Sequence, residues 1–87
     1  MQRITSEIDL ILALYPEARA NLIRAREESG MHPRVVAEQL NVSYPYYRGI
    51  EIGKNMPERE LAERIGRLFG KDANALMRGG EESEKGR

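Results

Sequence analysis

The chain has 87 residues, enough for one domain, and its 14 Lys and Arg residues balance 14 Asp and Glu residues. This neutral balance excludes the strongly basic coat of histone-like or ribosomal nucleic-acid binders. With 40% hydrophobic residues, 32% charged residues and no cysteine, the composition is that of a globular domain without disulfides or thiolate metal sites.

The first predicted helix covers residues 6–14, with Ser6 as its N-cap and apolar residues around most of its circumference. It should end there, because the residue before Pro16 avoids the helical region. A second helix is predicted over 16–29, with the proline in its first turn and Gly30 as its left-handed end. The apolar first helix has two open roles: a flap that closes the core, or a dimer interface.

Two short helices joined by a tight turn are predicted next. The first spans 33–40, and the second spans 44–52, with Ser43 as its N-cap and Gly53 as its end. A turn as short as 41–43 sets two helices at a steep angle. The start of the second helix then projects outward from the body.

The last predicted elements are a helix over 57–69, which starts at Pro57, and a short helix capped by Asp72. Residues 79–87 contain no apolar side chain and are predicted to be a disordered tail. Helices this short are stable only when their apolar stripes pack together, so we expect an all-α fold. It is predicted as a compact orthogonal bundle of five short helices plus an extra N-terminal helix, divided into 1–15 (extra helix), 16–78 (main domain) and 79–87 (tail).

Three short segments carry the most information, through their order and spacing. They read Leu22-Ile-Arg-Ala-Arg-Glu-Glu-Ser-Gly-Met, Val36-Ala-Glu-Gln-Leu-Asn-Val-Ser and Arg48-Gly-Ile-Glu-Ile-Gly-Lys. Together they resemble the helix-turn-helix of the Xre/Cro-type phage repressors, over about residues 20 to 77. The resemblance implies a helix-turn-helix domain at 16–78 in a sequence-specific DNA-binding transcriptional regulator, commonly a repressor. It also implies a homodimer that places a recognition helix in the major groove of double-stranded DNA.

The resemblance also assigns roles to residues. Arg26 and Glu51 match family positions that usually form an ion pair between two helices, which is a structural role. The predicted DNA contacts are Arg34, Ser43, Tyr44, Pro45, Tyr46, Arg48, Gly49, Lys54 and Asn55. Pro33 and Ile52 replace family residues that contact the DNA backbone, and Tyr44, Pro45 and Gly49 replace long polar side chains that read bases. Direct base readout is therefore expected to be weaker, while tyrosine contacts to phosphates or thymine methyl groups, and readout of DNA shape, remain available.

The charge balance leaves a second hypothesis open. Between Arg19 and Lys54 there are six basic and four acidic residues, a small excess for a protein that binds phosphates, although a dimer would double it. The same fold could instead bind a protein partner, as an antitoxin, antirepressor or adaptor does. In that case Tyr44, Tyr46 and Ile52 would form an apolar docking patch.

Catalysis and membrane insertion find no support in the sequence. No paired acids, Ser-His or Cys-His arrangement and no glycine-rich phosphate loop occur, so we expect no enzymatic activity and no cofactor. His32 alone cannot build a metal site, and we expect it to cap a helix or lie exposed. No apolar run approaches the roughly 20 residues of a membrane helix, and no signal-peptide cleavage site is visible. A cytoplasmic protein is expected.

Overall fold

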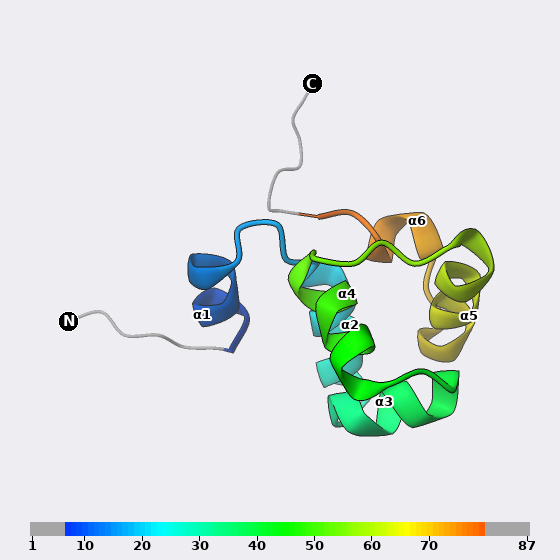
Figure 1. Cartoon of the computed structure of the whole chain (residues 1–87). Coiled ribbons are helices and arrows are strands. Elements are labelled where there is room, and N and C mark those ends of the chain that lie inside the picture. The colour runs from blue at the N-terminus through cyan, green and yellow to red at the C-terminus, as the bar shows by residue number, and fades with distance from the viewer. Residues whose placement is uncertain (1–6, 80–87) are drawn as a thin grey trace.

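Apolar residues spaced by three and four build helices throughout residues 7–79, the part of the chain that the computed structural model describes (Figure 1). The helices are α1 (Glu7–Leu14), α2 (Ala20–Glu28), α3 (Pro33–Leu40), α4 (Tyr44–Ile52), α5 (Arg59–Phe69) and α6 (Ala73–Leu76). No strand occurs within these residues, and the predicted all-α bundle of short helices is confirmed. The predicted cap Ser6 and residues 80–87 of the predicted tail lie outside the described residues.

Capping residues set the ends of α3 and α4 at the positions that the sequence predicted. The Ser43 hydroxyl accepts a hydrogen bond from the Tyr46 N–H at 3.2 Å and so caps the start of α4. Asn41 ends α3 in the left-handed conformation, with φ 61°. Gly53 ends α4 with φ 90°, and a side chain there would overlap the Glu17 carbonyl. Glycine is therefore needed at this position both for its backbone angle and for close packing.

The start of α2 corrects the sequence prediction, which placed it at Pro16. The helix begins at Ala20 instead, because Arg19 has non-helical angles of φ −89° and ψ 85°. The Arg19 N–H donates a hydrogen bond to the Glu51 carbonyl at 2.7 Å, at the end of α4. A tertiary contact thus holds the preceding segment away from the helical conformation that its residues favour locally.

The start of α5 also differs from the prediction. The helix begins at Arg59, two residues after Pro57, and Glu58 is its N-cap with an extended ψ of 167°. Pro57 is buried in the connection before the helix. Pro57 therefore precedes α5 and does not occupy its first turn.

Two apolar clusters hold the helices together. The main cluster contains Leu22, Ala25, Val36, Ala37, Leu40, Tyr47, Ile50, Leu61, Ile65 and Leu76. The second contains Ile8, Ile11, Ala18, Ala20 and Ile23, with Leu12 and Ile52 packed against it. The first cluster joins the helices from α2 through α6. The second cluster holds α1 against α2 and against the end of α4. Within the main cluster, Tyr47 is fully buried.

The packing of α3 leaves the start of α4 accessible. α3 contacts both α4 and α5, α6 contacts α2 and α5, and α1 lies at the edge of the body beside α2 (Figure 1). In the first turn of α4, Pro45 and Tyr46 are exposed, whereas Tyr44 and Tyr47 face the main cluster. The fold therefore presents this turn to solvent, as the sequence predicted.

Candidate nucleic-acid interface

The pair formed by α3 and α4 is a helix-turn-helix. Three residues join the helices, and the two helices pack against each other. Within the turn, the Val42 N–H donates to the Ala37 carbonyl at 3.0 Å, and the Val42 side chain packs against the main core. The tight turn and its half-buried valine fix the direction in which α4 leaves α3.

The nine predicted contact residues lie at different depths. Arg34, Ser43, Pro45, Tyr46 and Lys54 are exposed, Tyr44, Arg48 and Asn55 are half-buried, and Gly49 is buried. The exposed members gather at the start of α3, the first turn of α4 and the turn that follows α4. This surface is the candidate interface.

Tyr44 and Arg34 form a stacked pair across the helix-turn-helix. The Arg34 guanidinium carbon lies 4.3 Å from the centre of the Tyr44 ring, a cation–π contact. Of the two tyrosines at the start of α4, Tyr46 is 37% exposed and Tyr44 is half-buried. Tyr44 packs partly against the main core, and the Arg34 guanidinium lies over the face of its ring.

The N-terminus of α3 adds a hydrogen bond near this pair. His32 Nδ1 accepts a hydrogen bond from the Arg34 N–H at 3.0 Å and caps α3. The capping role expected for His32 is confirmed. Backbone and side chain of Arg34 are thus both held, so the guanidinium is positioned before any ligand arrives.

Glu51 is the centre of a buried ion network. Arg26 Nε lies 2.6 Å from Glu51 Oε2, and both side chains are almost fully buried. Arg48 Nη1 lies 2.6 Å from Glu51 Oε1 and is one-quarter exposed. The structure brings the predicted pair together and adds Arg48 as a third member. The charge of Arg48 is therefore directed at Glu51 and not outward, as a DNA contact would require.

Tyr47 lies beside this network and belongs to the core. Its hydroxyl is buried next to the Glu51 carboxylate. Burial raises the pKa of Tyr47, and the negative charge of Glu51 raises it further. The phenol therefore stays neutral, which suits a core side chain.

Gly49 is a packing position and not a surface contact, which corrects its predicted role. A methyl group at Gly49 would overlap the side-chain amide of Asn55. That amide donates a hydrogen bond to the Tyr46 carbonyl at 3.2 Å. The Lys54 and Asn55 N–H groups both donate to the Gly49 carbonyl, at 2.8 and 3.0 Å. The missing side chain lets the turn after α4 lie directly on the recognition helix.

The position of Ile52 differs from the docking patch predicted under the protein-binding hypothesis. Its side chain is half-buried and packs against the second cluster, on the side of α1. Tyr44 packs against the main cluster instead. The patch of Tyr44, Tyr46 and Ile52 therefore does not form as predicted.

Arg19 is the structural residue that sequence reasoning missed. Its guanidinium donates to the carbonyls of Ile50 at 2.6 Å, Asn55 at 3.0 Å and Met77 at 3.0 Å. The residue is 4% exposed, and burial lowers the pKa of Arg19. One sequence signal was available: the charge lies between two small apolar residues, Ala18 and Ala20. A cation at the C-terminal end of α4 also interacts favourably with the negative end of the dipole of that helix.

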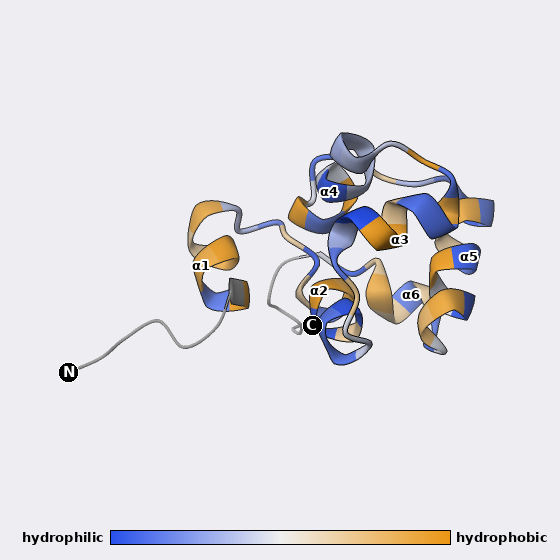
Figure 2. Cartoon of the chain, turned by 90° about the horizontal axis from the view of Figure 1, so that it is seen from below, coloured by the Kyte–Doolittle hydropathy of each residue, from blue (hydrophilic) through white to orange (hydrophobic). Residues whose placement is uncertain are grey.

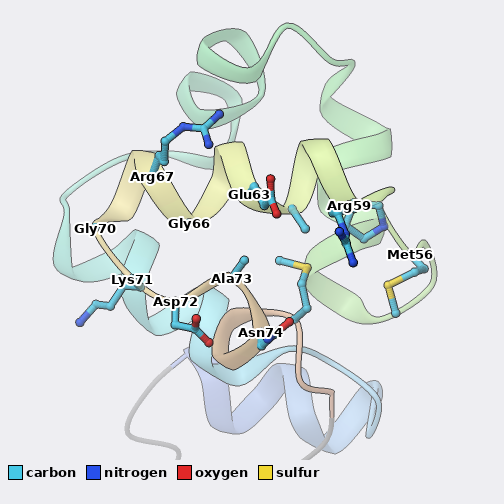
Figure 3. Close-up of a pocket in the computed structure, with 13 residues that line it drawn as sticks. Met56, Arg59, Glu63, Gly66, Arg67, Gly70, Lys71, Asp72, Ala73 and Asn74 are labelled. Carbon is cyan, nitrogen blue, oxygen red and sulfur yellow. The ribbon is translucent and has the colours of Figure 1, made fainter.

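A pocket of about 960 Å³ lies between α5 and α6, on another part of the molecule (Figure 3). Met56 and Met77 contribute apolar surface, and side chains of both signs, including Arg59, Arg67 and Asp72, line it. None of the nine predicted contact residues takes part in it. This pocket is therefore separate from the candidate interface.

Residues 7–79 contain no group of three or more His, Asp or Glu side chains arranged to hold a metal ion. Within the same residues, every helix is too short or too polar to cross a membrane.

Comparison with known proteins agrees with the geometry. The helix-turn-helix domain family matches residues 18–77, which is more than half of the chain. The protein belongs to this family of helix-turn-helix domains. The comparison with curated proteins and the comparison with solved structures each found no match.

The ion network predicts the response to removing Glu51. The Glu51→Ala variant should lose about 3–5 kcal/mol in the free energy of unfolding, because Arg26 would keep a buried charge without its partner. Urea unfolding followed by circular dichroism measures this loss. Glu38→Ala, on the exposed face of α3, is the matched control and should change stability by less than about 0.5 kcal/mol. Equal unfolding curves for the two variants would contradict the role given to the network.

The contact between Gly49 and Asn55 predicts coupling between two substitutions. Gly49→Ala should gain helix propensity but lose the Asn55 hydrogen bond, because the new methyl group displaces the amide. In an Asn55→Ala background only the gain remains. Gly49→Ala should therefore stabilise that background more than the wild type, by about 0.5–1.5 kcal/mol. Four urea-unfolding curves complete the cycle, and additive effects would refute the contact.

Proposed function

We propose that the protein is a sequence-specific DNA-binding transcriptional regulator of the Xre/Cro type that acts as a homodimer. The observation that supports this most is the exposure of Pro45 and Tyr46 in the first turn of α4, next to the Arg34 guanidinium that stacks on Tyr44. In a helix-turn-helix, the N-terminal residues of the second helix face the base edges of the major groove. Pro45 and Tyr46 occupy that place here.

The contacts divide into two kinds. Arg34 carries exposed positive charge beside the start of α4, where its guanidinium lies over the Tyr44 ring, and this charge suits a phosphate group. Tyr46 offers an aromatic ring and a hydroxyl, which suit a thymine methyl group or a phosphate oxygen. Ser43 is exposed, but its hydroxyl oxygen already caps α4, so its part is to position the helix.

The pattern of charges suggests weak electrostatic affinity per subunit. Three arginines near α4, namely Arg19, Arg26 and Arg48, donate to partners within the protein. A second subunit doubles the number of phosphate contacts and so supports the homodimer as the binding species.

Selection from a random duplex library at low salt tests the proposed function. The wild-type protein should enrich one sequence motif, and a labelled duplex with that motif should shift in a gel. The proposal would be contradicted if the recovered sequences shared no motif and no duplex shifted in the gel.

Substitutions should separate phosphate contacts from base contacts. Arg34→Ala should weaken binding to all duplexes and lower the salt dependence by about one ion per subunit. Tyr46→Ala should change the preferred sequence. Arg67→Ala, on α5 beside the separate pocket, is the control and should leave affinity unchanged. Fluorescence anisotropy over a salt series measures all three, and an equal loss for Arg67→Ala would argue against the assigned surface.

A further inference from the structure

The outward face of α1 is an apolar surface without a partner in the described chain. Ile8 and Ile11 point inward and are buried against α2. Leu10, Leu14 and Tyr15 are 49%, 66% and 45% exposed, and Figure 2 shows that hydrophobic residues make up most of α1. Leu10 and Leu14 are four residues apart and therefore lie on the same side of the helix. Neighbouring exposed apolar side chains of this size mark interaction surfaces.

A groove continues this surface toward the end of α4. It has a volume of about 410 Å³, and Leu14, Tyr15 and Ile52 give it apolar walls. The same groove is lined by one acidic residue, Glu17, and one basic residue, Lys54. Apolar walls and both charges thus occur on a single patch.

We propose that this patch, the outward face of α1 with the adjoining groove, is the contact between two copies of the chain. A two-fold contact uses the same patch twice, so the patch must complement itself. It does so in charge, because Glu17 can face Lys54 of the partner subunit while the leucines pack together. The balanced net charge of the chain also lets two copies approach without strong repulsion.

The location of the patch agrees with DNA binding by a dimer. Ile52 and Lys54 end and follow α4, so the contact adjoins the C-terminal end of the recognition helix. The first turn of α4, with Pro45 and Tyr46, lies at the other end of that helix and stays accessible. The inference rests on the proposed homodimer and names its interface.

Sedimentation equilibrium of the full chain, without DNA, tests the interface. The wild type should sediment as a dimer, and Leu14→Glu should raise the dissociation constant at least about 100-fold, because two carboxylates would meet in an apolar contact. Met56→Glu is the matched control, since Met56 is 69% exposed but lies outside the patch, and it should remain a dimer. Circular dichroism should show the same helix content for all three proteins.

A charge exchange gives a second, independent readout. Lys54→Glu should weaken the dimer, and adding Glu17→Lys should restore it, because the opposite charges again face each other across the two-fold axis. A monomeric wild type, or a Leu14→Glu variant that stays dimeric, would overturn the inference. Gel shifts keep the two proposals apart: a wild-type dimer that is disrupted by Leu14→Glu but binds no duplex refutes DNA binding alone. A wild type that binds DNA while Leu14→Glu remains a dimer refutes the interface alone.

Discussion

The orientation of α4 depends on a single buried carboxylate. Glu51 is fully buried, and a charge in that position is tolerated only when it is paired. Arg26 from α2 and Arg48 from α4 supply the pairing, while the Glu51 carbonyl accepts the Arg19 N–H. Side chain and backbone of the same residue thus tie α4 to α2 and to the segment before it. These contacts hold α4 from its C-terminal half, while Pro45 and Tyr46 in its first turn remain exposed.

The division of basic residues between buried and exposed positions explains how a chain of zero net charge presents positive charge beside α4. Arg19 and Arg26 hold helix ends and the ion network, and both are buried. Arg34 and Lys54 are exposed beside α4. The positive charge near the recognition helix is therefore divided between fold and surface, and a count over the sequence cannot separate the two uses. Tyr44 contributes to both, because it packs on the core and carries the Arg34 guanidinium.

Local chemistry was readable from the sequence, and long-range contacts were not. The limits of α3 and α4 follow from Ser43, Asn41 and Gly53, whose preferences for caps and left-handed backbone act within a few residues. The late start of α2 could not be predicted from Pro16, because it depends on a hydrogen bond between Arg19 and Glu51. Within the site, the positions of Tyr46 and of the pair Arg26–Glu51 followed from the resemblance. The Arg34–Tyr44 stack, the Arg48–Glu51 ion pair and the Gly49–Asn55 contact require the geometry of the turns.

We propose that the first turn of α4, whose helix Glu51 holds in place, contacts DNA. Chemical-shift mapping of the ¹⁵N-labelled protein, titrated with its selected duplex, tests this most directly. We expect the largest changes at residues 43–46 and at the Arg34 side chain, with small changes along α5 and α6. Changes concentrated on the α5–α6 pocket, with residues 43–46 unmoved, would contradict it.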